Sequence, residues 1–469
     1  MRKTKIVCTL GPATDEAGVL EDMIECGMDV ARMNFSHGDH DIHKKRIDRI
    51  KELRRTLNKP ISIMLDTKGP EIRIGTFESG RVFLRPGQQF ELCTNPCSGN
   101  EYSVFVNYPH LPDSVSVGNK ILFADGLIES EVIKFESGKV TVVIKNGGYL
   151  SGRKSINLPE TDLRMPYMSE SDMSDIRFGL ENDIDYIAAS FVRNADDIKD
   201  LRRFIRSECP KSNVRIISKI ENEEGVSNIS EIIDESDGVM IARGDMGVEI
   251  EFELLPEIQK RIIKQCLGKG KISITATQML ESMIENPRPT RAEVSDIANA
   301  IYDGTSAIML SGETAAGKYP QISVGTMARI AETTEKSINY KKRFTSFEFA
   351  RTSVTDAISH AVIMTAVDLN ASAILAVTRS GHTAYSVSGL RPFCPVYAIT
   401  QSEKVYHELS LSWGVTPVLC NTKNGDRFIE SLEEVKNLGK LRKGETVAVT
   451  GNSSESGGAT TNTLRVYTV

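Results

Sequence analysis

Two short hydrophobic runs, IISKIEN at residues 216–222 and GVMIARGDMG at residues 238–247, carry the pattern that decides the fold. Both are rich in β-branched residues, and a polar segment with the character of one helix separates them. This pattern is typical of a βαβ unit in a parallel sheet. The charged residues and the glycine that end the two runs are Lys219, Glu221, Arg243, Gly244 and Asp245. Because functional groups gather beyond the carboxyl ends of parallel strands, we expect these residues to face one cleft.

A lysine and two carboxylates in one cleft suit phosphate and metal chemistry. The ammonium group of Lys219 matches a substrate phosphate, and the oxygens of Glu221 and Asp245 match Mg²⁺. For one strand end alone, solvated loop charges explain the pattern equally well. The functional interpretation gains weight because other strand ends of this chain also carry charge.

The same alternation of strand and helix extends in both directions from this stretch. The strands that we expect begin near residues 5, 29, 61, 186, 214, 238, 272 and 306. Eight such units close a TIM barrel, which would collect all the strand ends on one face. The other polar residues just after these strands include Arg32, Asn34, Asp66, Lys68, Thr277, Ser311 and Glu313. Arg32 stands inside an apolar run, so it needs an anionic partner.

Two further segments do not follow the barrel pattern. Between residues 71 and 165, short alternating runs are split by glycine and helical periodicity is absent, which predicts an inserted all-β domain. From about residue 344 onward, helices and strands alternate again in a separate α/β unit. We therefore expect a (β/α)8 barrel at 1–69 and 167–342, an inserted β-barrel domain at 70–166 and a C-terminal α/β domain at 343–469.

Composition excludes several classes of partner. The chain has 469 residues, of which 40% are hydrophobic and 26% charged, and its net charge is −6 without a basic tract. These values argue against nucleic acid or an anionic membrane as the main partner. The 8 cysteines are scattered, as expected of reduced thiols, and the N-terminal apolar run is too short for a signal peptide. We expect a cytoplasmic protein.

A phosphate cradle is predicted in the C-terminal domain. The sequence TRSGHT at 378–383 follows a strand and precedes a helical pattern. Hydroxyls and glycine at a helix N-terminus bind phosphate because free N–H groups and the helix dipole converge there. An ordinary capped turn remains the alternative. The P-loop-like run from Gly312 to Lys318 is discounted, because Tyr319 occupies the position where a hydroxyl must bind Mg²⁺.

Seven motifs together resemble the pyruvate kinase family, and the resemblance covers essentially the whole chain. They occur in the order of that family: ARMNFSHG (31–38), LDTKGPEIR (65–73), ISKIEN (217–222), ARGDMGVE (242–249), TATQMLESM (275–283), PRPTRAEVSDIANAIYDGTSA (287–307) and MLSGETAAGKYP (309–320). The resemblance implies transfer of the phosphoryl group of phosphoenolpyruvate to ADP, giving pyruvate and ATP. It also implies a barrel, a lid, an allosteric C-terminal domain and a homotetramer.

The resemblance assigns roles residue by residue. Glu221 and Asp245 would hold Mg²⁺ or Mn²⁺, and Lys219 would stabilise the transferring phosphoryl group and the enolate oxygen. Arg32 would contact the phosphoryl group, while Gly244, Asp245 and Thr277 would hold the substrate carboxylate. The K⁺ site would comprise Asn34, Ser36, Asp66 and Thr67, with Glu71 typical of K⁺-dependent members. The nucleotide would contact His37, Arg73 and Lys154. The effector loop would comprise Thr378, Ser380, Gly381 and Thr383.

Several alternatives stay open. The loop at 451–460 contains no lysine or arginine, so a sugar monophosphate or AMP is at least as plausible an effector as a bisphosphate. The proton donor to the enolate is not readable, and Thr277, Ser311 and Glu313 with water are our candidates. A metal-dependent aldolase or lyase of pyruvate would share Glu221 and Asp245 but would not need ADP. A sugar-phosphate sensor would bind effector without turnover.

Overall fold

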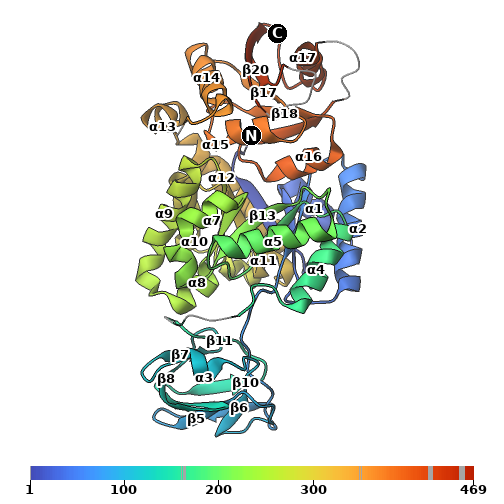
Figure 1. The fold of residues 1–469 in the computed structure, drawn as a ribbon. Helices are drawn as coiled ribbons and strands as arrows, with labels where there is room; N and C mark the ends of the chain where they lie inside the picture. The colour runs from blue at the N-terminus through green and yellow to red at the C-terminus, as the bar shows by residue number, and fades with distance from the viewer. Residues whose placement is uncertain are drawn as a thin grey trace.

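The structure is a computed structural model with three parts stacked in a row. It describes residues 2–159, 161, 165–347, 349, 351–420, 426–453 and 460–469. In Figure 1 the C-terminal domain lies at the top, a ring of helices around a barrel lies in the middle, and a small β domain hangs below. Among the described residues, no helix combines the length and the apolar character needed to cross a membrane.

Eight parallel strands form a closed barrel, which confirms the predicted TIM fold. Their order around the barrel is β1-β16-β15-β14-β13-β12-β3-β2. The strands are β1 (Lys5–Thr9), β2 (Val30–Asn34), β3 (Ser62–Asp66), β12 (Tyr186–Ala189), β13 (Arg215–Ile220), β14 (Gly238–Ala242), β15 (Ile272–Ala276) and β16 (Ala307–Leu310). Every residue of β1, β3, β12, β14, β15 and β16 is buried, so these strands read as continuous apolar runs.

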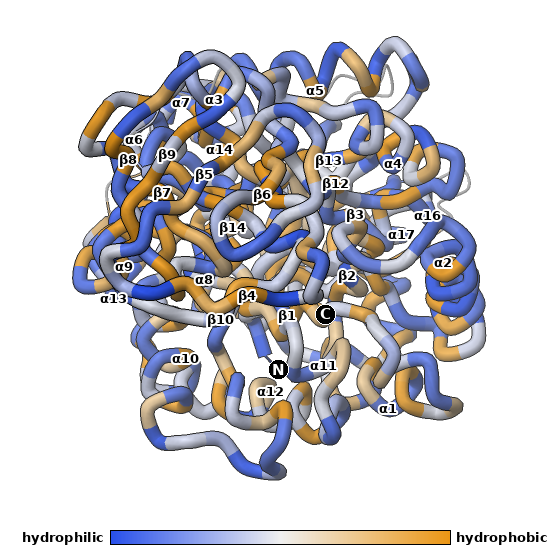
Figure 2. The backbone as a smooth tube through the Cα atoms, turned by 90° about the horizontal axis from the view of Figure 1, so that it is seen from below, coloured by the Kyte–Doolittle hydropathy of each residue, from blue (hydrophilic) through white to orange (hydrophobic). Residues whose placement is uncertain are grey.

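Helices cover the outside of the barrel. They are α1 (Val19–Cys26), α2 (His40–Thr56), α4 (Glu170–Glu181), α5 (Ala195–Glu208), α9 (Leu255–Gly268), α10 (Arg291–Asp303) and α12 (Pro320–Lys336). Ser169 and Thr290 begin α4 and α10 with reciprocal capping boxes, and Gly27 ends α1 with φ 122°. Figure 2 shows α2 as largely hydrophilic with separate hydrophobic patches, in keeping with a helix that buries only one face.

One helix prediction was wrong in the central βαβ unit. The segment between β13 and β14 forms two helices, α6 (Glu223–Ser227) and α7 (Ile229–Glu235), instead of one. Asn228 ends α6, and its side-chain amide donates a hydrogen bond to the backbone carbonyl of Arg193 at 3.0 Å. This contact with a neighbouring loop holds the chain at a break that helical periodicity alone does not reveal.

The inserted domain is all-β, as predicted, and backbone bridges from Arg73 to Ser155 and from Ile74 to Val106 connect the two edges of its main sheet. The strands β11-β7-β8-β9-β5-β6 form one sheet, and β10 and β4 form a separate pair. Their bounds are β4 (Arg81–Leu84), β5 (Gln89–Cys93), β6 (Ser103–Phe105), β7 (Lys120–Phe123), β8 (Ile128–Glu136), β9 (Lys139–Ile144), β10 (Gly148–Ser151) and β11 (Ile156–Asn157). A short helix, α3 (Leu111–Ser114), and a separate hydrophobic core complete this domain.

The C-terminal domain has one five-stranded sheet with the order β19-β18-β17-β20-β21. The strands are β17 (Ala373–Val377), β18 (Val396–Thr400), β19 (Val415–Leu419), β20 (Thr446–Gly451) and β21 (Thr463–Thr468). The helices of this part are α13 (Tyr340–Ser346), α14 (Val354–Asp368), α15 (His382–Gly389), α16 (Glu403–Glu408) and α17 (Arg427–Asn437). Most of the 451–460 loop lies outside the described residues.

The C-terminal domain closes the base of the barrel. Leu411 is fully buried and belongs to the same hydrophobic cluster as the interior side chains Val7, Met64 and Met240. The hydroxyl of Ser62, at the start of β3, lies 2.7 Å from that of Ser410. The opposite, carboxyl ends of the strands therefore face away from this domain, toward the lid.

We expect Leu411→Ala to lower stability by about 2–5 kcal/mol, because it removes a buried side chain and leaves a cavity. Thermal unfolding of the full chain measures this change. Leu438→Ala is the matched control, since Leu438 is 50% exposed. Equal unfolding midpoints for the two variants would show that Leu411 does not stabilise the base of the barrel.

Candidate active site

The ammonium group of Lys219 lies at the centre of a buried polar cluster at the barrel mouth. Its Nζ donates to Asp66 Oδ1 at 3.0 Å and to Ser190 Oγ at 2.7 Å, and lies 2.9 Å from Glu221 Oε1. These four residues come from the ends of three neighbouring strands, β3, β12 and β13. Closure of the barrel thus joins Lys219 to a carboxylate 153 residues away in the sequence.

Arg32 has the anionic partner that its place in an apolar strand demanded. Its Nε donates to Asp66 Oδ2 at 2.6 Å, and its Nη1 donates to Thr9 Oγ1 at 2.7 Å. Burial by itself raises the pKa of Asp66, but Arg32 and Lys219 outweigh it and hold that pKa below its ordinary value. Asp66 is therefore an anion held between two cations.

Glu221 is buried beside the same ammonium group. Burial raises the pKa of Glu221 to about 7, against the attraction of Lys219. Its Oε2 accepts a hydrogen bond from the backbone N–H of Phe191 at 2.7 Å. Its Oε1 has only the ion-pair contact with Lys219 and no well-aligned hydrogen bond within the described part of the chain. A buried carboxylate oxygen in this state is suited to accept a cation.

Asp245 and Gly244 belong to a short helix, α8 (Arg243–Glu249), which we did not predict. Asp245 lies in its first turn and is exposed. The N–H of Gly244 donates to Thr277 Oγ1 at 2.8 Å, so two groups assigned to the substrate carboxylate contact each other. A helix N-terminus with a hydroxyl beside it is a suitable anion-binding arrangement.

Thr277 is held in a strained conformation at the end of β15. Its φ is 69°, in the left-handed region that β-branched residues rarely occupy. Arg243 fixes this loop, since its Nη2 donates to the carbonyl of Thr277 at 2.6 Å and its Nε to that of Ala276 at 3.2 Å. An ion pair with Asp296 at 2.8 Å anchors the guanidinium in turn.

The candidates for proton transfer are not equally placed. Glu313 is buried, and its two oxygens accept hydrogen bonds from the backbone N–H groups of Leu280 at 2.9 Å and Ser311 at 2.7 Å. This carboxylate therefore bridges the loops after β15 and β16. The hydroxyl of Thr277 donates to the carbonyl of Ala276 at 2.6 Å.

The four oxygen-bearing residues assigned to K⁺ lie on adjacent strand ends. Asn34 and Asp66 are paired residues of β2 and β3. Asn34 Oδ1 accepts from the N–H of Ser36 at 3.1 Å, and the hydroxyl of Thr67 accepts from the N–H of Ser190 at 3.1 Å. Amide, hydroxyl and carboxylate oxygens in one place suit a hard monovalent cation.

The residues assigned to the nucleotide are less closely connected. Arg73 pairs with Glu71 at 2.6 Å and donates to the carbonyl of Arg153 at 2.8 Å, next to the exposed Lys154. Burial raises the pKa of Glu71, although Arg73 opposes this effect. His37 comes from a different part of the chain, the loop after β2, and it is exposed. Its backbone carbonyl contacts the ring of His43.

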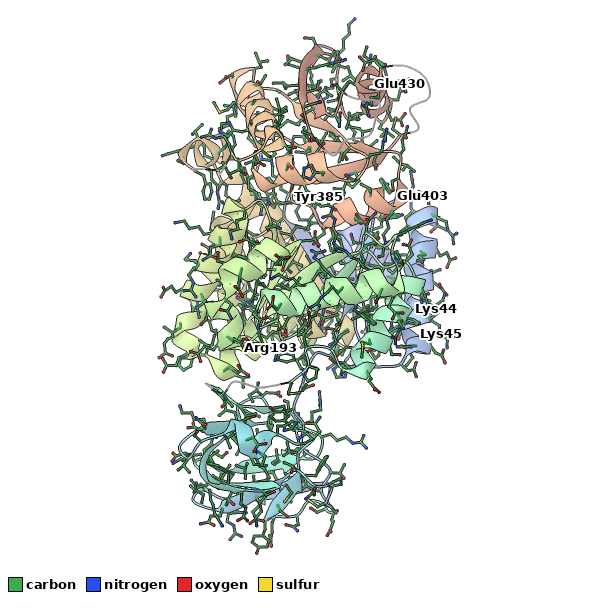
Figure 3. The ribbon with its side chains drawn as sticks, viewed as in Figure 1. Lys44, Lys45, Arg193, Tyr385, Glu403 and Glu430 are labelled. Atoms are coloured by element: carbon green, nitrogen blue, oxygen red, sulfur yellow. The ribbon has the colours of Figure 1, made fainter. Side chains whose placement is uncertain are left out.

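The lid and the barrel mouth enclose a common cavity of about 560 Å³. Its walls come from the lid, from α6 and from α8, and they include Glu71, Asn157, Asn222, Asp245, Val248 and Glu249. Asn157 of the lid donates to Glu249 of α8 at 3.1 Å. Figure 3 places Arg193, another wall residue, at the lid-facing end of the barrel. Asp245, one of the two residues assigned to the divalent cation, therefore lines the same cavity as residues of the lid.

Two residues of this site were missed in the sequence, Ser190 and Thr9. Ser190 immediately follows β12, which ends at Ala189. Applying the strand-end rule to every strand would have found Ser190. Thr9 is the last residue of β1 and carries no charge, so no sequence signal separates it from a buried strand residue.

Comparison with known proteins agrees with this geometry. The family model "Pyruvate kinase, barrel domain" matches residues 1–324, and "Pyruvate kinase, alpha/beta domain" matches residues 356–467. The chain belongs to the pyruvate kinase family. A pyruvate kinase of Sporosarcina psychrophila is 47% identical over 474 residues, which cover 100% of this chain and 81% of the relative. One of Staphylococcus epidermidis is 44% identical over 477 residues, with the same two coverages.

A solved pyruvate kinase from Cryptosporidium parvum supports the same family from its fold. It superposes with a TM-score of 0.93 at 36% identity, covering 100% of this chain and 96% of the other. The chain is therefore an enzyme of the phosphotransferase class, with the pyruvate kinase reaction between phosphoenolpyruvate and ADP. The roles of individual residues are argued below from their contacts.

The predicted effector loop lies at the first turn of α15. Gly381 precedes the helix with φ 82°, where a side chain would be strained. Thr378 is half-buried and Ser380 is exposed, whereas Thr383 is buried and its hydroxyl lies 2.8 Å from that of Thr461. Thr378 and Ser380 are thus the hydroxyls more available to a ligand.

We expect Lys219→Met to lower kcat by at least about 100-fold while the KM for phosphoenolpyruvate changes little. Methionine keeps the length of the side chain but removes the charge that offsets the transferring group. Steady-state kinetics measure both constants, and Lys260→Met, at an exposed lysine, is the control. An unchanged kcat would refute the role assigned to Lys219.

Proposed function

We propose that this pyruvate kinase requires Mg²⁺ and K⁺ and is activated by a phosphorylated metabolite. The observation that carries the catalytic part is the Lys219 ammonium between Asp66 and Glu221, with Arg32 on the other oxygen of Asp66. In phosphoryl transfer, the main contributions of a protein are to position the reactants and to neutralise their charge. A cluster in which buried cations and carboxylates meet is suited to that task.

Glu221 and Asp245 are the residues that would hold the divalent cation. Mg²⁺ is commonly bound through one or two carboxylates, with substrate oxygens and water completing its shell. The buried Oε1 of Glu221 has no aligned donor among the described residues, so the donor set fits. When bound, the cation would offset charge on phosphoryl and carboxylate oxygens.

Other residues of the site would bind the two charged groups of the substrate, its phosphoryl group and its carboxylate. Arg32 and Lys219 would contact the phosphoryl group, because both are held at the mouth by Asp66. The N–H groups that begin α8 and the hydroxyl of Thr277 would bind the carboxylate, replacing the contact they make with each other. Positioning both ends of a small substrate orients the phosphoryl group for transfer. The lid then excludes water from the cavity.

The nucleotide would be held from both sides of the cleft. Arg73 and Lys154 lie at the strands that connect the lid, since Ile74 N–H donates to the carbonyl of Lys154 at 2.9 Å. His37 lies on the barrel after β2. We propose that these three residues contact ADP and that the lid moves to bring them together.

The proposed reaction is tested by mixing the protein with phosphoenolpyruvate and measuring pyruvate and ATP. We expect product only when ADP and Mg²⁺ are both present. Pyruvate release that does not depend on ADP would favour an aldolase or a lyase. Binding without turnover would favour a sensor.

We expect replacement of KCl by tetramethylammonium chloride, at equal ionic strength, to depress kcat strongly. The large organic cation cannot enter a site formed by Asn34, Ser36, Asp66 and Thr67, so charge near the phosphoryl group is left unbalanced. Titration of KCl back into the assay should restore activity with saturation. Indifference to K⁺ would contradict the proposed monovalent site.

Effector binding at α15 has a physical connection to the catalytic strand. The ring of Tyr385 packs against the Cα of Gly381, where an added Cβ would lie 2.6 Å from ring carbon Cε2. The centre of the same ring also lies 3.8 Å from the guanidinium carbon of Arg215, the first residue of β13. Figure 3 shows Tyr385 at the side of the C-terminal domain that faces the barrel. A phosphate bound at Thr378 and Ser380 would therefore act next to the strand that carries Lys219.

We expect the double variant Thr378→Ala and Ser380→Ala to lose activation by phosphorylated metabolites while basal turnover persists. The assay compares sugar monophosphates, AMP and fructose bisphosphate with the wild type. Ser386→Ala on the same helix is the control, since its hydroxyl donates to the carbonyl of His382, one turn earlier in the chain, at 3.0 Å. Activation that survives the double variant would place the effector elsewhere.

We also propose a cytoplasmic homotetramer. Val294 and Tyr302 on α10 and Val466 on β21 are exposed hydrophobic residues that subunit contacts would cover. β21 is an edge strand paired only with β20 in the described sheet, so it offers free backbone groups to a second copy. Light scattering of the purified chain measures the assembly.

A further inference from the structure

We infer that Ser190 is a positioning residue that couples the Lys219 ammonium to the monovalent-cation loop at Asp66 and Thr67. The inference rests on the proposed function, because it concerns the groups assigned there to phosphoryl transfer and to K⁺. Ser190 itself has no charge and is 1% exposed. It is assigned no contact with substrate, so its effect must pass through the groups that it holds.

The contacts of the Ser190 hydroxyl leave little freedom to Lys219. Its Oγ accepts from Lys219 Nζ at 2.7 Å, the shortest of the three contacts of that ammonium. The hydroxyl proton is then available to the carbonyl of Thr67 at 2.7 Å or to Asp66 Oδ1 at 3.2 Å. One side chain thus bridges the catalytic cation and both residues of the K⁺ loop.

The backbone of Ser190 reinforces the same loop. Its N–H donates to Thr67 Oγ1 at 3.1 Å, and its carbonyl accepts from the buried hydroxyl of Tyr167 at 3.0 Å. A Cβ added at Gly69 would lie 2.9 Å from Ser190 Cβ, so the loop and Ser190 pack without space between them. The position of the hydroxyl is therefore fixed by its surroundings, as expected of a group that orients others.

Loss of this hydroxyl has two linked consequences. The ammonium loses its one neutral acceptor and is drawn toward the carboxylates Asp66 and Glu221, away from its position in the cluster. The carbonyl of Thr67 loses its donor and is free to turn, which changes the oxygen set available to K⁺. Misplacement of a reacting group by about 1 Å costs on the order of 100-fold in rate.

The test compares Ser190→Ala and Ser190→Thr with the wild type. In Ser190→Ala we expect kcat to fall by about 10–100-fold, the KM for phosphoenolpyruvate to stay nearly unchanged, and half-saturation by KCl to rise several-fold. Ser190→Thr keeps the hydroxyl and should recover part of both effects. The control is Ser236→Ala, which removes an equally buried hydroxyl that bonds Ile232 and Ser218 outside the cleft.

A second measurement does not need turnover. The rise in unfolding temperature on addition of KCl, relative to tetramethylammonium chloride, reports K⁺ binding to the folded chain. We expect this rise in the wild type and in Ser236→Ala, and a smaller one in Ser190→Ala. It also shows whether each variant is folded.

The inference is overturned if Ser190→Ala matches Ser236→Ala in kcat and in its response to KCl. It is also overturned if only the KM for phosphoenolpyruvate rises, since that would indicate a substrate contact instead of a positioning role. Absence of turnover in the wild type would overturn the proposed function itself, and the K⁺-dependent unfolding temperatures of the variants would still decide the coupling of Ser190 to the loop.

Discussion

The site depends on the ion pairs that the buried ammonium of Lys219 makes with Asp66 and Glu221. Removing charges from water is costly, and a buried ion is tolerated when partners of opposite sign surround it. Together with Arg32, the cluster contains two side chains of each sign, so the barrel mouth can remain folded before substrate arrives. This balance also raises the pKa of Lys219 against the effect of burial, which keeps it charged.

The same balance explains why metal cations belong in the proposed mechanism. A substrate with a carboxylate and a phosphate near its second ionisation adds net negative charge to a nearly neutral cluster. Lys219 and Arg32 are already engaged with Asp66 and cannot offset that charge alone. A divalent cation at Glu221 and Asp245 and a monovalent cation at the Asp66 loop would restore neutrality. The cations thus follow from the charge of the cluster as much as from its ligand types.

The sequence predicted the framework of this site because the strands are buried on both faces. The eight barrel strands begin within one residue of their expected positions. Strand ends in a parallel barrel converge whatever the sequence distance, so Lys219 and Asp66 could be placed together without coordinates. The family resemblance supplied roles that strand counting alone could not.

What the sequence did not reveal depends on contacts between segments that are distant along the chain. Asn228 breaks a helix because it meets the carbonyl of Arg193, and Thr277 adopts a positive φ while Arg243 binds its carbonyl. Ser190 was overlooked because a serine just after an apolar strand has no charge that demands a partner.

β13 runs from the base of the barrel to its mouth, and this places Lys219 and a contact with the proposed effector domain on one element. Arg215 at its start contacts Tyr385 of α15 and lies 3.6 Å from Glu408 at the end of α16, both in the C-terminal domain. Burial raises the pKa of Glu408 to about 7 although Arg215 opposes this effect. A six-residue strand is too short and too well packed to absorb a displacement at one end. A shift of α15 would therefore reach Lys219 through the strand itself, without requiring the whole barrel to rearrange.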